Sequence, residues 1–259
     1  MSTFESRDNE QTKDYLGNMI PHFKTRLHHI RSRSYNMAKI LNEQLDYPML
    51  NGDKIDIKIE KNEYENLGKL IITDNCNNGF QNINEEGKNN PFCFGFEKEN
   101  HKKDDELSEF GCGGKESGAA CCNLMTYVTK VDDVCYKITY DFPKMRDCEN
   151  INDSYYPTKF EIISNEEYIG IHHLEQGSSI ILEKFIYGLY NVLKGDDINK
   201  DFEKNINDTY KYILKNSRIQ VTIDGKLIET IDNLFDNKLV KPLNLDCHLC
   251  VKRNPIDNK

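Results

Sequence analysis

An acidic residue stands directly after an apolar, strand-like run. Leu70-Ile-Ile72 leads into Asp74, and Gly79 follows five residues later. A carboxylate at the end of a strand can accept a hydrogen bond from an exocyclic amine, and a glycine lets the backbone approach a flat ring closely. Asp-Asn turns after strands are also common structural features, so Asp74 by itself does not define a binding site.

A glycine-rich segment lies further along the chain. Gly111-Cys-Gly-Gly-Lys115 and Ser117-Gly118 precede a run of small residues that predicts a short helix to about Leu124. Backbone N–H groups at a helix N-terminus bind phosphate, and a lysine adds a positive charge there. The spacing is not that of a P-loop, which has four residues between its first glycine and Gly-Lys. A plain flexible loop is the structural alternative.

The third candidate for chemistry is Glu43. It lies in a segment from about Pro21 to Leu45 where apolar residues recur at helical spacing. We expect this helix to end at Tyr47-Pro48, because proline disfavours a helical residue before it. A carboxylate near the end of such a helix can orient or deprotonate a water molecule. The alternative is an ordinary glutamate on a solvated helix face.

The elements that must position these residues are mostly strands. Strand-like runs are predicted at 55–60, 70–72, 125–130, 134–141, 158–164 and 178–184. A helix is predicted over 198–215, followed by a hairpin over 218–229 with an Asp224-Gly225 turn. The polar segment 81–107 is too long for a simple connection and is typical of a lid or binding loop. Many strands beside few helices predict an α+β fold, in which helices cover one face of a mixed sheet.

Composition and charge exclude some classes of function. The 259 residues carry a net charge of −9, which argues against a dominant nucleic-acid-binding face, since phosphate contacts need clustered Lys and Arg. No apolar stretch is long enough for a transmembrane helix, and the N-terminus lacks a signal-peptide pattern, so no membrane partner is expected. Nine cysteines without such a signal indicate reduced thiols in an intracellular, reducing compartment, cytoplasmic or nuclear.

Other candidate groups receive structural interpretations. Cys121-Cys122 is expected to pack as small apolar side chains, and Cys247-His-Leu-Cys250 has the spacing of half a zinc site without a second pair after it. Two histidine pairs are interpreted as surface or core side chains, namely His28-His29 and His172-His173.

Five segments, taken in order, resemble the GHKL ATPases (gyrase B, Hsp90, histidine kinases and MutL), and within them the microrchidia (MORC) type. They match the first-helix motif, the Asp-x-Gly-x-Gly adenine motif, a Phe-Gly-Phe-Ser-x-Lys segment, a lid motif followed by a Thr-Lys strand end, and a Gly-Thr-x-Ile motif. The adenine motif has one extra residue here and lacks its first glycine. The matching segments are Glu43-Gln-Leu-Asp-Tyr47, Ile71-Ile-Thr-Asp74-Asn-Cys-Asn-Asn-Gly79-Phe80, Phe94-Gly-Phe-Glu-Lys98, Ser108-Glu-Phe-Gly-Cys-Gly-Gly-Lys115 with Thr129-Lys130, and Gln176-Gly-Ser-Ser-Ile-Ile181.

The resemblance implies a Bergerat sandwich, a mixed and mainly antiparallel sheet backed by helices, with ATP held between helices and a mobile lid. Asp74 would bind adenine N6, Gly79 would permit the close approach, and Ser178 would support Asp74 through a hydroxyl or a water. Glu43 would be the catalytic residue that activates the attacking water. The implied nucleotide-binding set also includes Lys98 and the residues that would wrap the phosphates, Gly111, Gly113, Gly114 and Lys115.

The metal ligand is the main departure from the family pattern. Tyr47 stands where the family carries the asparagine that holds Mg²⁺, and a phenol is a poor magnesium ligand. Moving the alignment by four residues would place Glu43 on that position and Lys39 on the position of the base, where a lysine does not serve. We prefer the first alignment, because it keeps the glutamate. With this alignment ATP is the expected cofactor, and the Mg²⁺ ligand stays unassigned. Because a metal ion normally stabilises the phosphates during transfer, ATP binding is better supported than ATP hydrolysis.

The resemblance also predicts the domain organisation. Residues 1–204 would form the ATPase-like domain with a lid at about 81–118, and residues 205–259 resemble the start of a transducer. The expected partner is a nucleotide. The family usually dimerises when ATP binds, so an ATP-dependent homodimer is possible here, and DNA is a partner by family analogy alone. A catalytically degraded pseudo-ATPase, acting as a nucleotide-sensing or protein-interaction module, is the alternative. A histidine-kinase catalytic domain is weaker, since no phosphoacceptor helix is present.

Overall fold

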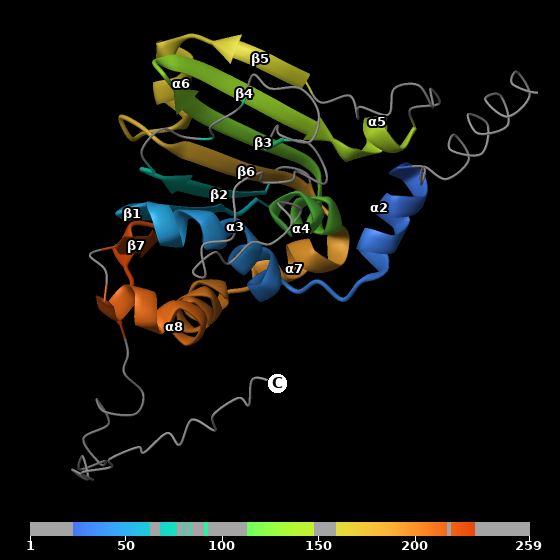
Figure 1. Ribbon diagram of the computed structural model, residues 1–259. Helices are drawn as coiled ribbons and strands as arrows, with labels where there is room; N and C mark the ends of the chain where they lie inside the picture. The colour runs from blue at the N-terminus through green and yellow to red at the C-terminus, as the bar shows by residue number, and fades with distance from the viewer. Residues whose placement is uncertain are drawn as a thin grey trace, which may run out of the picture.

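The structure is a computed structural model that describes residues 23–62, 68–76, 80, 83, 91–92, 113–147, 159–216 and 219–230. Eight strands form one sheet in the order β5-β4-β3-β6-β2-β1-β7-β8 (Figure 1). β1 and β7 pair in parallel, and the other neighbouring strands pair antiparallel. The strands are β1 (Lys54–Glu60), β2 (Lys69–Asp74), β3 (Cys122–Val131), β4 (Val134–Asp141), β5 (Lys159–Ile163), β6 (Ser178–Phe185), β7 (Gln220–Ile223) and β8 (Lys226–Leu227).

Helices cover one face of this sheet. Apolar side chains of α2, α3, α4, α5, α7 and α8 join one core cluster with Ile55 of β1 and Leu70 of β2. Figure 1 shows α3, α4, α7 and α8 gathered beside the sheet, with α6 at its other end. The helices are α2 (Phe23–Ser32), α3 (Met37–Asn51), α4 (Gly113–Cys121), α5 (Phe142–Arg146), α6 (Asn165–Ile171), α7 (Tyr187–Lys194) and α8 (Ile198–Asn216).

The two faces of the sheet follow from side-chain alternation along the strands. Ile55 and Ile57 are buried against the helices, and Asp56 between them points to the opposite side. We call these two sides the covered face and the open face. Tyr168 of α6 packs on Val128 at the β3–β4 end of the open face, as a separate small cluster. The α+β class and the mixed sheet backed by helices are therefore confirmed.

The first helix differs from its prediction. The expected single helix from Pro21 to Leu45 contains two helices, α2 and α3, because Asn36 caps the second one by accepting a hydrogen bond from the Lys39 N–H at 2.8 Å. The expected end at Tyr47-Pro48 was wrong by about one turn. Pro48 lies inside the last turn of α3, whose end is closed by a bond from the Gly52 N–H to the Pro48 carbonyl.

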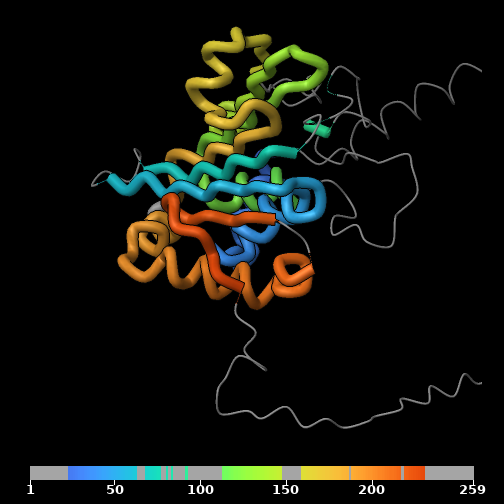
Figure 2. The backbone as a smooth tube through the Cα atoms, turned by 90° about the vertical axis from the view of Figure 1, so that its left-hand side faces the viewer, coloured from blue at the N-terminus to red at the C-terminus, as the bar shows by residue number. Residues whose placement is uncertain are grey.

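The C-terminal elements agree with their predictions. α8 spans Ile198–Asn216, and the β7–β8 hairpin turns at Asp224 (φ 48°) and Gly225 (φ 78°), as a primed two-residue turn requires. α8 crosses the expected domain boundary between 204 and 205. In Figure 2 the red segment that holds β7 lies beside the blue strand β1, in agreement with their pairing, and the orange α8 lies beyond it.

Three helices were not anticipated from the sequence, namely α5, α6 and α7. They are short, with lengths of 5, 7 and 8 residues, so each offers at most two turns of periodicity. Within the described part of the chain, no helix is both long enough and apolar enough to cross a membrane.

Candidate functional site

Asp74 is the last residue of β2 and lies on the covered face. Its side chain is 3% exposed, and its Oδ1 atom accepts a hydrogen bond from the Cys76 N–H at 2.9 Å. Burial raises the pKa of this carboxyl, while hydrogen bonds from Cys76 and from the Ser178 backbone lower it. Among the described residues Asp74 has no ion-pair partner. A buried carboxylate without a cation is costly, and such groups concentrate at functional sites.

Two hydroxyl groups support the strand end beside Asp74. Ser178 is the register partner of Asp74 and of Thr129, and the Ser178 and Thr129 hydroxyls are 2.8 Å apart. The Phe80 N–H donates to the Thr129 hydroxyl at 3.4 Å. Ser178 therefore contacts the Asp74 carboxyl through its backbone, and its hydroxyl is paired with Thr129.

Glu43 of α3 and Gly113 of α4 lie in direct contact. A Cβ atom on Gly113 would be 1.8 Å from Glu43 Oε2, so only glycine fits here while the carboxylate keeps its place. Gly113 is the first residue of α4, where unpaired N–H groups favour negative charge. The structure thus places Glu43, the predicted base, in contact with the glycine-rich segment at the N-terminus of α4.

The acidity of Glu43 is also altered by its surroundings. Burial and the nearby Asp46 raise the pKa of the Glu43 carboxyl, and Lys39 opposes them. Asp46 is itself partly buried and accepts a hydrogen bond from the Tyr210 hydroxyl of α8 at 2.7 Å. A carboxylate with a raised pKa is a better proton acceptor than one fully in water.

Gln44, which the sequence did not single out, fixes the start of α4. Its Nε2 atom donates to the Gly114 carbonyl and to the Ser117 hydroxyl, both at 2.7 Å. Because a carbonyl only accepts, the amide orientation is determined, and Oε1 is a buried acceptor that has no hydrogen-bond partner among the residues that the structure describes. Gln44 lies within the segment that resembles the first-helix motif, but no role was assigned to it there.

Lys115 lies inside the molecule. Its side chain is 6% exposed, and its ammonium group donates to the Pro91 carbonyl at 2.7 Å. The lysine expected to contact phosphate is therefore directed toward residue 91, and it would have to leave this bond to reach a ligand.

Tyr47 contacts aromatic side chains and lies near Asp74. Its ring stacks on Phe80 with centroids 5.7 Å apart and 19° between the planes. Phe80 contacts Phe92 and Tyr127 edge-on, at 5.0 and 5.6 Å. Burial, Cys76 and Asp74 raise the pKa of Tyr47 to about 12, so its hydroxyl is neutral at physiological pH. Tyr47 is one turn from Glu43, so α3 extends from the α4 N-terminus to the Asp74 strand end.

Gly177 is a further residue of this site. Its φ is +112°, and a Cβ there would be 2.0 Å from the Asp74 carbonyl. It lies within the segment that resembles the Gly-Thr-x-Ile motif, but it was not assigned a role from the sequence. Positive φ together with a backbone contact admits glycine alone.

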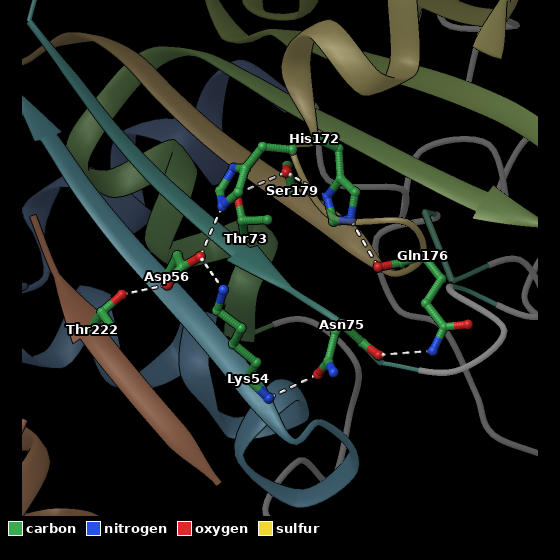
Figure 3. Close-up of polar contacts among 9 residues, drawn as sticks. Lys54, Asp56, Thr73, Asn75, His172, Gln176, Ser179 and Thr222 are labelled. Atoms are coloured by element: carbon green, nitrogen blue, oxygen red, sulfur yellow. Dashed lines mark hydrogen bonds and ion pairs between the residues drawn. The ribbon is translucent and has the colours of Figure 1, made fainter. Parts of the chain in front are cut away.

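His172 and His173 occupy opposite environments, as Figure 3 shows for their polar neighbours. His172 is fully buried and lies between the Ser179 hydroxyl and the Gln176 carbonyl, each at 2.8 Å. His173 is exposed on the open face, where Nε2 contacts Asp56 Oδ2 at 2.8 Å. The pair was interpreted as surface or core histidines, and the structure places His172 in the core and His173 on the surface.

Several predicted residues lie outside the described part of the chain, namely Gly79, Lys98, Gly111 and the Cys247–Cys250 pair. Within the described ranges, no group of three or more His, Cys, Asp or Glu side chains is arranged to hold a metal ion. The structure brings together Glu43, Gly113 and Gly114, and separately Asp74 and Ser178. No protein-family model matches the chain, and no curated protein matches it.

Proposed function

We propose that this chain binds ATP between β2, α3 and α4, as a GHKL protein of the microrchidia type with a Bergerat sandwich. The observation that carries this proposal is the Asp74 carboxylate. It is buried at the end of a strand on the covered face and is held by backbone N–H groups of Cys76 and Ser178. The lid, at about 81–118, would close over the bound nucleotide and so act as a conformational switch.

A buried carboxylate selects a ligand by its donors. Asp74 presents acceptor oxygens, so it favours the exocyclic N6 amine of adenine. Guanine would present its O6 acceptor at the same position and leave two acceptors facing each other. We therefore expect discrimination in favour of adenine, because unpaired buried polar groups are costly.

Hydrolysis would rest on Glu43. Its raised pKa and its place at the N-terminus of α4 support a role as the base that activates water beside the terminal phosphate. The residues do not supply the family's magnesium ligand, since Tyr47 is a neutral phenol stacked on Phe80. No step of the proposed reaction is therefore assigned to a metal ion.

A second candidate is a pseudo-ATPase that binds nucleotide and acts as a sensing or interaction module. Two observations favour it: the neutral Tyr47 at the metal position, and Lys115, whose ammonium is bonded to the Pro91 carbonyl. In this alternative the nucleotide would shift the conformation of α4 and the lid without turnover.

Calorimetric titration with ATP, ADP and GTP, each with Mg²⁺ and with EDTA, tests these proposals. We expect ATP and ADP to bind and GTP to bind at least ~10-fold more weakly, because its O6 opposes Asp74. Absence of ATP binding, or equal affinity for GTP, would contradict the adenine assignment. Phosphate release that requires Mg²⁺ would favour the ATPase, and binding indifferent to EDTA without release would favour the pseudo-ATPase.

A further inference from the structure

His172 is a buried imidazole located beneath the Asp74 strand end. It directly follows α6, is 0% exposed, and packs on the Tyr168 ring with centroids 4.8 Å apart. Figure 3 shows it between Ser179 and Gln176, close to Thr73 of β2. No role in binding or catalysis is assigned to it by the site described above.

The hydrogen bonds of His172 have a fixed direction. Nε2 lies 2.8 Å from the Gln176 carbonyl, which can only accept, so Nε2 carries the proton. Nδ1 is then an acceptor, and the Ser179 hydroxyl donates to it at 2.8 Å. The Ser179 oxygen in turn accepts from the Thr73 hydroxyl at 2.9 Å. The neutral imidazole thus holds a serine on one side and a backbone carbonyl on the other.

The Thr73–Ser179 hydrogen bond links β2 and β6 one residue before the pair that contains Asp74. Thr73 and Ser179 are register partners of β2 and β6, and the next pair along is Asp74 and Ser178. Successive side chains point to opposite faces, so a hydrogen-bond chain on the open face fixes a residue pair that is presented on the covered face.

The turn at Gln176 and Gly177 provides a second route to Asp74. The Gly177 carbonyl accepts from the Tyr168 hydroxyl at 3.2 Å and from the Lys130 N–H at 3.3 Å. The Gln176 carbonyl accepts from His172. Three donors therefore hold a turn that packs on the Asp74 backbone, and the next N–H, that of Ser178, reaches the Asp74 carboxyl.

We propose that His172 is a positioning residue for Asp74, which keeps the Asp74 carboxylate and the Ser178 N–H in the orientation that receives the adenine amine. Its effect on affinity rests on the proposed function, whereas its effect on the Asp74 carboxyl does not. A histidine that only filled the core would stabilise the fold without setting this orientation.

Three variants separate these roles. His172→Phe keeps a ring on Tyr168 and removes both hydrogen bonds. His172→Asn keeps an acceptor near the position of Nδ1, and is the conservative variant. His173→Gln is the matched control, because its side chain contacts Asp56 on the open face and not the Asp74 strand end.

Two readouts are needed: the ¹³C signal of the Asp74 carboxyl through a pH titration, assigned with Asp74→Asn, and the ADP dissociation constant from calorimetry. We expect His172→Phe to change the Asp74 titration and to weaken ADP binding about tenfold, which corresponds to ~1.4 kcal/mol. We expect His172→Asn to recover part of both effects, and His173→Gln to match the wild type in both.

The outcomes distinguish the two proposals. An unchanged Asp74 titration in folded His172→Phe would overturn the positioning role, as would equal changes in His173→Gln. A wild type that does not bind ADP, together with an altered Asp74 signal in His172→Phe, would refute the proposed function and retain the positioning role. If His172→Phe does not fold, the comparison of His172→Asn with His173→Gln decides by the same criteria.

Discussion

The covered and open faces of the same sheet treat polar side chains in opposite ways. On the open face ionisable side chains pair with one another: the Lys69 ammonium lies 2.8 Å from Glu183, and His173 Nε2 lies 2.8 Å from Asp56. On the covered face, Asp74 is buried and bonded to backbone N–H groups, with no ion pair among the described residues. The open face carries partly solvated ion pairs of modest strength, while the covered face buries a carboxyl group whose pKa is raised by burial, which is the pattern expected of a binding site.

Glu43→Ala gives the largest expected effect on this comparison. If the covered face catalyses hydrolysis, loss of the base should lower turnover roughly 1,000-fold while ATP binding persists. Phosphate release and calorimetry measure the two quantities. Glu60→Ala on the exposed end of β1 is the control and should leave turnover unchanged. Turnover at the wild-type rate in Glu43→Ala would indicate a different base.

Gly177→Ala should destabilise the fold strongly, because the new Cβ would overlap the Asp74 carbonyl at a positive φ. We expect the free energy of unfolding to fall by about 3 kcal/mol. Gly225→Ala is the control, since Gly225 also has a positive φ but nothing lies within 4 Å of its Cβ position. It should lose only about 1 kcal/mol. If chemical denaturation shows the same loss of unfolding free energy in both variants, the close contact of Gly177 with the Asp74 carbonyl is not the cause.

Asp74→Asn should weaken ADP binding roughly 100-fold, which corresponds to ~2.7 kcal/mol, because the amide presents donors toward the adenine amine. Its free energy of unfolding should stay level or rise, since an ionisable group that is costly to bury is replaced by a neutral amide. Asp56→Asn should do the reverse. It should leave affinity intact and lower stability. Burial raises the pKa of Asp56, but its contacts with Thr222, His173 and Lys54 together outweigh burial and lower that pKa. Unchanged ADP affinity in Asp74→Asn would remove the adenine assignment.

The pH dependence of stability provides a fourth test. Burial lowers the pKa of His172 to about 4, from 6.5 when unfolded, so the unfolded chain gains a proton first as pH falls. The His172 contribution is present above pH 6.5 and is lost between pH 6.5 and about 4, with a slope of at most ~1.4 kcal/mol per pH unit. The raised pKa values of Asp74 and Glu43 act in the opposite sense. Subtracting the curve of His172→Phe from that of the wild type isolates the histidine. A difference that does not vary across this pH range would contradict the assignment.

Lys69→Ala should have the smallest effect. Its pair with Glu183 lies on the open face, and the Lys69 side chain is 39% exposed. We expect a loss of ~0.5 kcal/mol in the free energy of unfolding, which should shrink further in high salt. A loss above ~2 kcal/mol in chemical denaturation would mean that the open face contributes more than solvated ion pairs do.

Local patterns predicted much of the fold. The alternation from Ile55 to Glu60, the helix over 198–215 and the Asp224-Gly225 turn are all present. The break between α2 and α3 was missed, because apolar residues continue across it at helical spacing. The break becomes visible only from the Asn36 side chain, which accepts a hydrogen bond from the Lys39 N–H. The short helices α5 to α7 were missed because so few turns give too little periodicity.

The candidate site was predicted in part. Asp74, Glu43 and the glycine-rich segment stood out by charge and spacing, and the contact of Glu43 with Gly113 agrees with their grouping. Gln44, His172 and Gly177 did not stand out as site residues. The Gln44–Ser117 and Gly177–Asp74 contacts join residues 73 and 103 positions apart, the role of Gly177 depends on the sign of one backbone angle, and the His172–Ser179 contact forms only against the folded sheet. Lys115 stood out for a role at phosphate, yet its ammonium lies against Pro91.

The sequence by itself determined which strands alternate, where the hairpin turns and which residue types are available for chemistry, because these depend on neighbours a few residues apart. Only the tertiary structure decided which carboxyl group and which histidine are buried and which glycine admits a close contact. Burial and hydrogen bonding between distant segments set the free energy of each charge, and those segments meet only when the sheet has formed.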